Sequence, residues 1–273
     1  MWWILAGSLA MLRLHRGTAV CLMLIALGWG MIDKVIDFSG LLAIAGIGLI
    51  CLIVKAGDGF WRGLKPAGEV LLLASAIGLF VHIFPGFNNP KIIDAVKVGQ
   101  QSAPFSMWFN FDKAIIPFIL LMALPTLFYR PSVYRPARWA WLLLILSVPA
   151  LLLIAVGLGG LRIEAHFPEW LGSFVLANLF FVSLAEEALF RGYLQQRLAG
   201  WLGPIPALFV TALVFGLAHI AGGVMLMVFA ALAGVIYGLA WMWSGRLWTS
   251  TLFHFALNLC QLLLFTYPYY LNS

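Results

Sequence analysis

Nine long apolar runs, separated by short polar breaks, constrain the fold of this chain more than any other feature. They lie roughly at residues 18–32, 39–55, 67–84, 114–129, 139–160, 169–190, 204–220, 223–243 and 247–266. Most of them approach the ~17 to 25 residues that an α-helix needs to cross a bilayer. Because 63% of the residues are hydrophobic and only 10% are charged, water can solvate little of the chain. The sequence therefore predicts an all-α, polytopic transmembrane bundle of about 8–10 helices.

The first twelve residues are apolar but too short for a comfortable crossing. They lack the basic start and the small-residue cleavage site of a secretory signal. We expect either an interfacial helix or a further, tilted crossing. No long repeat or soluble domain is apparent, so one membrane domain is expected to account for the chain.

Lys and Arg are concentrated in alternate breaks between the apolar runs. The excess of 16 Lys+Arg over 10 Asp+Glu would suggest a nucleic-acid partner in a soluble protein, but here it is better explained as a topology signal. We therefore expect no nucleic-acid partner, and we expect the basic breaks on the cytoplasmic side of the bilayer. They lie at residues 13–16, 55–65, 129–138, 191–200 and 244–246. The loop at 85–113 and the C-terminus are then predicted outside, although nothing in that loop identifies a ligand.

Two adjacent acids, Glu186 and Glu187, end one of the apolar runs. A carboxylate in the bilayer interior costs ~2.5 to 3.5 kcal/mol even on gentle insertion scales, so such a residue is a functional candidate by default. Glu187 and Arg191 are four residues apart on a helix and can form an ion pair. Glu186 is rotated by about 100° from Glu187 and needs partners on other helices.

Three polar residues in later apolar runs are the candidate partners of Glu186. His219 ends FGLAH, while His254 and Asn258 are four apart and share a helical face. Counted from the turn near Leu202, both Glu186 and His219 climb about 24 to 26 Å, so they are expected to meet at one level. Asn258 climbs roughly 20 Å from its own turn. We expect the four polar groups to line one cavity within the membrane.

This set of groups suits peptide-bond hydrolysis. A carboxylate beside an imidazole can take a proton from water and pass one to a leaving amine. A second imidazole and the amide of an asparagine can stabilise the oxyanion of a tetrahedral intermediate. Ser183 is a weaker candidate nucleophile, because a serine on a membrane helix is usually hydrogen-bonded to its own backbone.

Three motifs carry a resemblance to a known family. Residues 186–191 fit EExxxR, 215–219 fit FxxxH and 254–258 fit HxxxN. Their types and order resemble the CPBP family of intramembrane proteases, which includes the CAAX prenyl endopeptidase and abortive-infection proteins. The resemblance covers about the last hundred residues, and the three motifs show no departure from the family's pattern.

The resemblance implies an intramembrane endopeptidase without a cofactor, acting on a membrane-associated protein or peptide. Residues 166–273 would form the catalytic core, and residues 1–165 would be N-terminal helices of unassigned role. Glu186 and His219 would activate water, and His254 and Asn258 would support the oxyanion. Glu187, Arg191 and Phe215 would be in supporting positions. The implied location is a prokaryotic cytoplasmic membrane.

Two alternatives of different classes are kept. Glu186, His219 and His254 could ligate zinc and leave an open position for water, although the HExxH signature is absent. The same polar cavity could instead serve a non-enzymatic binding, immunity or transport protein, although no repeat typical of transporters is found.

Overall fold

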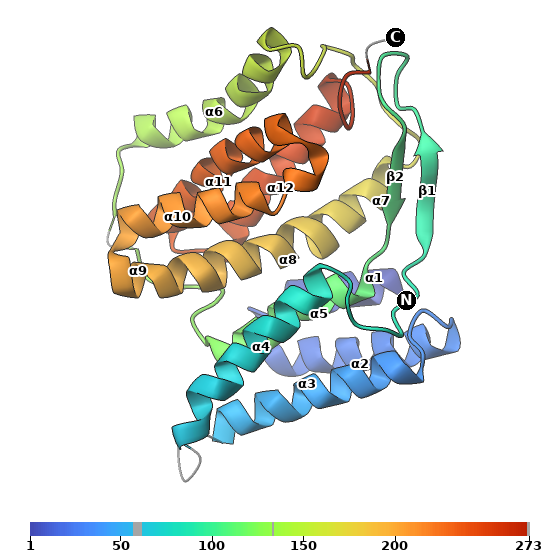
Figure 1. Ribbon diagram of the computed structural model, residues 1–273, viewed down its shortest axis with the longest axis vertical. Helices are drawn as coiled ribbons and strands as arrows, with labels where there is room; N and C mark the ends of the chain where they lie inside the picture. Colours follow the sequence, from blue (N-terminus) through green and yellow to red (C-terminus); the bar gives the residue numbers. More distant parts are fainter. Residues whose placement is uncertain (57–61, 133, 272–273) are drawn as a thin grey trace.

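The computed structural model describes residues 1–56, 62–132 and 134–271 and is built almost entirely of helices (Figure 1). This confirms the all-α prediction. Residues 57–61 of the second basic break, Val133 of the third and the last two residues, 272–273, lie outside the described residues.

Each of the nine apolar runs forms a helix, and α1 precedes them. The N-terminal part comprises α1 (Trp2–Met11), α2 (Arg16–Ile32), α3 (Phe38–Ala56), the 3₁₀ turn η1 (Arg62–Leu64), α4 (Lys65–Phe80), α5 (Phe111–Ala123) and α6 (Arg138–Gly157). A long helix follows, made of α7 (Leu171–Leu176), η2 (Ala177–Ser183), α8 (Leu184–Glu187), η3 (Ala188–Gln195) and α9 (Gln196–Leu202). The last elements are α10 (Pro204–Leu217), the 3₁₀ turn η4 (Ile220–Gly222), α11 (Val224–Ser244) and α12 (Leu247–Leu264).

Five of these helices are long and apolar enough to cross a membrane. They are α3, α6, the long helix Leu171–Leu202, α11 and α12. The other four apolar runs form helices that are too short to meet this criterion among the described residues. The first helix, α1, has 10 residues and buries Leu5 and Leu9 inside the protein.

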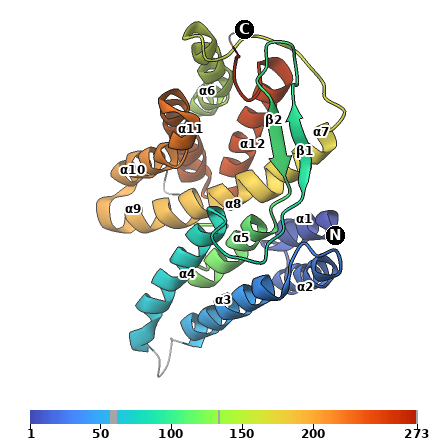
Figure 2. The same ribbon diagram turned by 45° about the vertical axis from the view of Figure 1, so that its right-hand side comes forward.

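The long helix Leu171–Leu202 lies at the centre of the bundle. Its apolar window is 72% buried inside the protein, against 17% for that of α3. Figures 1 and 2 show the long helix passing between the α10–α12 group and the helices α1 to α5. The acidic pair is therefore placed in the interior of the protein and not on its lipid-facing surface.

The breaks between helices lie at two ends of the molecule, as the charge pattern predicts. At the basic end, the backbone N–H of Arg130 donates to the carbonyl of Gly245, at 2.9 Å. At the other end, the N–H of Ala103, in the loop at 85–113, donates to the carbonyl of Tyr269 near the C-terminus, at 3.1 Å. Which end faces the cytoplasm stays a prediction.

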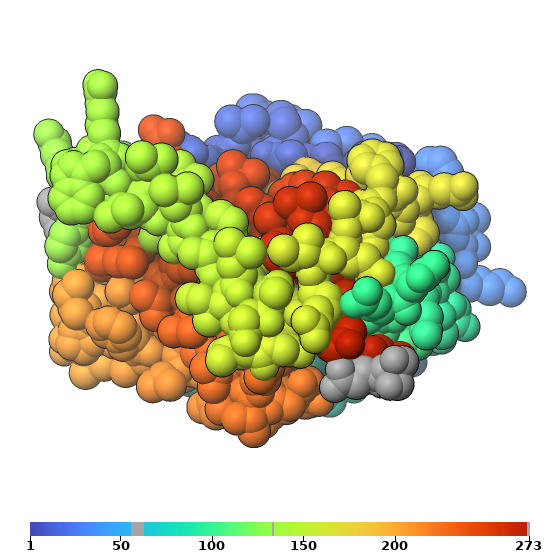
Figure 3. Space-filling model, turned by 90° about the horizontal axis from the view of Figure 1, so that it is seen from above, coloured from blue at the N-terminus to red at the C-terminus, as the bar shows by residue number. Residues whose placement is uncertain are grey.

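The loop at 85–113 contains a β-hairpin that the apolar pattern did not predict. Strands β1 (Lys91–Val96) and β2 (Phe105–Trp108) pair antiparallel, and the hairpin stands beside the end of α12 and the start of α7 (Figures 1 and 2). Seen from above, the connection after α6 lies between α11 and the hairpin, with C-terminal residues beside it (Figure 3). Residues 266–271, which we call the C-terminal strap, border this end of the molecule.

Candidate active site

The long helix changes its winding around the acidic pair. Its segments η2 and η3 are π-helical and flank the α-helical turn Leu184–Glu187. A π-helix brings residues i and i+5 onto one face. Accordingly, the Ser183 hydroxyl donates to Asn178 Oδ1, at 3.2 Å. The expectation that Ser183 bonds its own backbone is therefore wrong.

Glu187 joins two of the three motifs. Its Oε1 accepts from Nη1 of Arg191 at 2.8 Å, and both side chains are completely buried. This is the ion pair that the spacing predicts. The same oxygen lies 3.0 Å from Nδ1 of His254 on α12. The contact with His254 was not expected, because the sequence analysis assigned Glu187 only to Arg191.

Arg191 is held by a group of aromatic rings and a backbone carbonyl. Its guanidinium carbon lies 4.3 Å from the ring centre of Phe215 and 5.2 Å from that of Tyr237. Its Nη2 donates to the carbonyl of Gly234, at 3.1 Å. These contacts and Glu187 replace the water that a buried cation loses.

The segment Gly234–Gly238 brings α11 close to the long helix. The Gly238 carbonyl accepts from Gln195 Nε2 at 3.2 Å, one turn beyond the bond between Arg191 and Gly234. A Cβ atom on Gly234 would lie 3.1 Å from both Arg191 Nη2 and the Cα of Ala212. Glycine is therefore needed for the backbone of α11 to reach the EExxxR motif.

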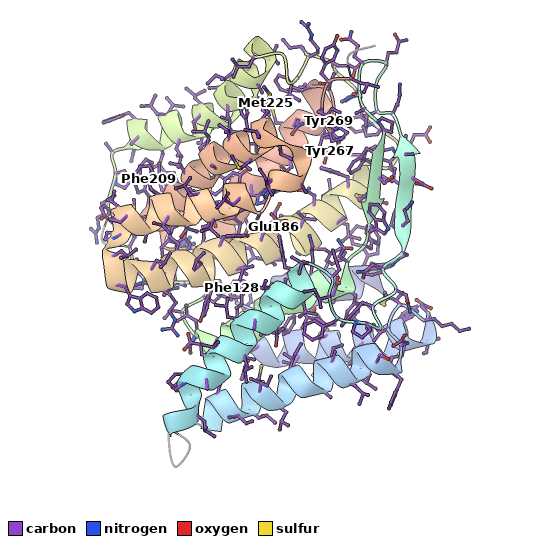
Figure 4. The ribbon with its side chains drawn as sticks, viewed as in Figure 1. Phe128, Glu186, Phe209, Met225, Tyr267 and Tyr269 are labelled. Atoms are coloured by element: carbon purple, nitrogen blue, oxygen red, sulfur yellow. The ribbon has the colours of Figure 1, made fainter. Side chains whose placement is uncertain are left out.

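Glu186 is 5% exposed and lies near the middle of the long helix (Figure 4). Its Oε2 is buried and has no hydrogen-bond partner among the residues that the structure describes. Buried polar atoms in native proteins are nearly always paired, and an unpaired one often marks a functional site. Oε2 of Glu187 is buried and unpaired as well, so the two acids differ in that Glu187 bonds Arg191 and His254 through its other oxygen, whereas Glu186 makes no hydrogen bond to a described residue.

His219 has a defined tautomer. Its Nδ1 lies 2.8 Å from the carbonyl oxygen of Phe215. Since a carbonyl can only accept, Nδ1 carries the proton and Nε2 keeps a lone pair in the neutral ring. The ring of Phe215 lies 4.7 Å from that of His219 and 5.7 Å from that of His254. Phe215 therefore packs against both imidazoles.

His219, His254 and Asn258 line one cavity of about 470 Å³. Much of the remaining wall is apolar and comes from α6, α11 and the C-terminal strap. The expectation that all four polar groups line the cavity is met for these three residues. Glu186 is not among the lining residues, and the structure records no hydrogen bond between Glu186 and His219.

Asn178 is the polar residue that the sequence analysis missed. Its Oδ1 accepts from Nδ2 of Asn258, at 3.2 Å, in addition to the hydroxyl of Ser183. An amide nitrogen has two hydrogens, so Asn258 keeps one donor free while the other is fixed. The signal that could have found Asn178 is an amide inside an apolar run, two turns before Glu186.

The zinc alternative can be tested against the side chains. In His219 and His254 the Nδ1 atoms face a carbonyl and a carboxylate, an arrangement common for histidines that bind metal through Nε2. However, no group of three or more His, Cys, Asp or Glu side chains within residues 1–56, 62–132 and 134–271 is placed to hold a metal ion. The ring tautomers suit a metal site, and the spacing of the three ligands does not.

Residues 168–260 match the family model described as Type II CAAX prenyl endopeptidase Rce1-like. The matched stretch includes all three motifs, which confirms the resemblance to the CPBP intramembrane proteases. Searches of curated proteins and of solved structures found no match. Together with the five long apolar helices, the family match indicates an integral membrane protein with protease activity.

Proposed function

We propose that this protein, whose residues 168–260 match a protease family, hydrolyses a peptide bond of a membrane-associated protein or peptide with water activated by Glu186 and His219. The observation that carries the proposal is the single cavity onto which residues of the FxxxH and HxxxN motifs converge. The proposed base is Glu186 of the remaining motif, whose Oε2 has no hydrogen-bond partner among the described residues; this carboxylate does not itself line the cavity and would act next to it.

The proton transfers in this reaction balance without a cofactor. Glu186 takes a proton from water as the water oxygen attacks the carbonyl carbon. The proton then passes through the free Nε2 of His219 to the leaving nitrogen as the C–N bond breaks, so both residues return to their starting states. A low-dielectric cavity favours this exchange, because it disfavours a charged intermediate that lacks partners.

Asn258 and His254 are proposed to stabilise the oxyanion. Asn178 fixes the amide of Asn258, which leaves one amide hydrogen for the oxyanion. The Nδ1 of His254 faces Glu187, so its Nε2 can donate only when the ring is an imidazolium. The charges of Glu186, Glu187, Arg191 and such a ring sum to zero, which suits a buried cluster.

A zinc-dependent reaction is the second candidate, favoured by the tautomers of His219 and His254. Glu186 and the two Nε2 atoms would hold zinc, which would supply a Lewis acid, only after these side chains move together, because their spacing in this structure does not suit a metal ion. Metal content of the purified protein, and hydrolysis with and without a chelator, separate the two candidates. Full activity of metal-free protein supports the glutamic reaction, whereas loss on chelation and recovery with zinc supports the metal reaction.

The family's printed description suggests prenylated CAAX termini as the first substrates to test. We would measure cleavage of a farnesylated peptide ending in a CAAX sequence by purified protein in lipid vesicles. Glu186→Gln should lower the rate by ~10² to 10⁴, the usual contribution of a general base. The control is Glu169→Gln, which changes an exposed acid in the connection before α7.

A wild-type rate in Glu186→Gln excludes Glu186 as the base. If wild-type protein does not cleave the peptide, membrane-protein termini from cells with active and Glu186→Gln protein should be compared by mass spectrometry. Identical termini in both would overturn the proposed function. The prokaryotic cytoplasmic membrane is the location proposed for this comparison.

A further inference from the structure

Tyr237 on α11 is the residue in closest stacking contact with a proposed oxyanion residue. Its ring lies parallel to the imidazole of His254, with centroids 4.7 Å apart and planes 11° apart. The ring of Phe215 stands edge-on to both, at 6.1 Å from Tyr237 and 5.7 Å from His254. The imidazole is therefore fixed by a flat contact with Tyr237 and an edge contact with Phe215.

The same tyrosine contacts the charged pair behind His254. The guanidinium of Arg191 lies 5.2 Å from the ring centre of Tyr237, while Glu187 bonds both Arg191 and His254. The Tyr237 ring therefore contacts both side chains that bond Glu187, and it limits the movement of Arg191 and His254. Tyr237 thus belongs to the group that sets the rotation of the His254 imidazole.

The hydroxyl of Tyr237 is the second part of the argument. Tyr237 is 1% exposed and lines the cavity of about 470 Å³, and its hydroxyl makes no hydrogen bond to any residue within the described parts of the chain. By contrast, the hydroxyl of Tyr193 donates to Glu69, at 2.7 Å. The Tyr237 hydroxyl is not among the fully buried polar atoms that lack a partner, so it is open to the cavity, where a bound molecule with an acceptor would gain a hydrogen bond.

We propose that Tyr237 positions His254 through its ring and binds the substrate through its hydroxyl, which donates to a carbonyl of the peptide. The inference rests on the proposed proteolytic function and deepens it. A peptide carbonyl is an acceptor that every residue of a substrate carries, so this contact reads the backbone and not a side chain. The apolar wall of the cavity is left to contact the side chains.

Two substitutions separate the two roles. Tyr237→Phe keeps the ring and removes the hydroxyl, whereas Tyr237→Leu removes both. With the farnesylated CAAX peptide in vesicles, Tyr237→Phe should raise KM by ~3- to 10-fold with little change in kcat, as expected for one neutral hydrogen bond made in the ground state. Tyr237→Leu should lower kcat as well. Tyr129→Phe, which removes an exposed hydroxyl at the basic end, is the control.

A second readout needs no substrate. The ¹⁵N resonances of the His254 ring report its tautomer and surroundings, and they should stay in place in Tyr237→Phe and shift in Tyr237→Leu. Unchanged resonances in Tyr237→Leu overturn the positioning role. Equal KM and equal peptide Kd in wild type and Tyr237→Phe overturn the binding role. If the wild type neither binds nor cleaves this peptide, KM and Kd are measured on a substrate identified by the comparison of membrane-protein termini. Identical termini overturn the binding role together with the proposed function, while the resonances still decide the positioning role.

Discussion

At the scale of single residues, the two adjacent acids have different surroundings. Glu187 shares its Oε1 between Arg191 and His254, whereas neither oxygen of Glu186 has a hydrogen-bond partner in the described part of the chain; Oε2 is buried and unpaired in both acids. Paired carboxylates fix structure, and unpaired buried ones are available for proton transfer. The adjacent positions therefore suit two roles, one for Glu187 in holding the site and one for Glu186 in the chemistry.

The first prediction concerns the buried pair of Glu187 and Arg191. Arg191→Leu leaves the charge of Glu187 buried without a partner, and Glu187→Leu does the same to the charge of Arg191. Each change should lower the free energy of unfolding by ~3 to 5 kcal/mol. Both single variants should unfold at lower temperature in detergent. The double variant should recover much of the stability, because no lone charge remains, but little activity, because His254 has lost its carboxylate partner. Single variants with wild-type unfolding that abolish hydrolysis would show instead that the pair is catalytic.

The second prediction concerns the two amides. Asn258→Ala removes a donor to the oxyanion and should lower kcat by ~10² to 10³. Asn178→Ala only frees the Asn258 amide to rotate, so a loss of about 10-fold is expected, equal to one hydrogen bond of ~1.4 kcal/mol. Peptidase assays on both variants and on the exposed-residue control Asn88→Ala check this order. An Asn178→Ala loss as large as that of Asn258→Ala would place Asn178 in direct contact with the substrate.

The types of the site residues were predictable from the sequence, but some of their contacts were not. Glu186, His219 and His254 can be identified without any structure, because a carboxylate or an imidazole inside an apolar run is costly in lipid. The bond between Glu187 and His254 depends on the rotation of two helices about their axes, which apolar runs leave undetermined. The match of residues 168–260 to a protease family does not test the individual roles, so these stay predictions.

At the scale of elements, the apolar runs predicted where helices occur but not how they are wound. The π-helical segment η2 places Ser183 and Asn178 on one face, and a count at 3.6 residues per turn cannot show this. The hairpin was missed because its short strands lie within a polar loop with only one fully buried position in β1. Such strands give a weaker pattern than a membrane helix.

The third prediction concerns the crossing of α10 and α11. Gly216 lies within the FxxxH motif, and a Cβ there would lie 2.7 Å from both the carbonyl oxygen of Met227 and the Cβ of Ala231. Gly216→Ala must push the helices apart, so a loss of ~1 to 3 kcal/mol in the free energy of unfolding is expected, together with lower activity as His219 moves. Gly46→Ala on α3 has no atom within 4 Å of the added Cβ and is the control.

Gly46→Ala should be neutral or stabilise the protein by up to ~1 kcal/mol, because alanine favours a helix more than glycine does. Unfolding in denaturant, followed by tryptophan fluorescence, compares the two variants. Equal stability of Gly216→Ala and Gly46→Ala would mean that the close crossing does not constrain the α10–α11 pair.

At the scale of the whole molecule, the N-terminal helices and the motif-bearing helices share contacts throughout. The ring of Trp2 lies 5.6 Å from that of Phe181, and the hydroxyl of Tyr193 donates to Glu69 on α4. One hydrophobic cluster runs from Leu5 to Phe265. These contacts join the N-terminal helices to the motif-bearing helices. The organisation as one membrane domain, with residues 166–273 as its catalytic core, remains a prediction.

The loop at 85–113, the connection after α6 and the C-terminal strap meet at Glu164. Its Oε1 accepts from the N–H of Gln101 at 3.0 Å, and its Oε2 accepts from the hydroxyl of Ser102 at 2.7 Å. The Ser102 oxygen in turn accepts from the N–H of Tyr267, at 3.1 Å. Since the strap residues Pro268–Tyr270 border the cavity, Glu164 connects three distant segments to the wall of the proposed site.

The fourth prediction is a pH dependence of this connection. Partial burial alone would raise the pKa of Glu164, but hydrogen bonds from Gln101 and Ser102 outweigh it and hold the pKa below its ordinary value of 4.5. A carboxyl with a lowered folded pKa stabilises the folded state above its unfolded pKa, and this contribution is lost as the pH falls through the folded value. Hydrogen exchange in residues 266–271, corrected for intrinsic rates, should therefore be slow at pH 6 and rise below about 4.5. In Glu164→Gln, residues 266–271 should exchange faster at pH 6, and the exchange should no longer depend on pH in this way. The control Glu169→Gln should behave as wild type. Equal pH profiles in all three proteins would show that the C-terminal strap is held without Glu164.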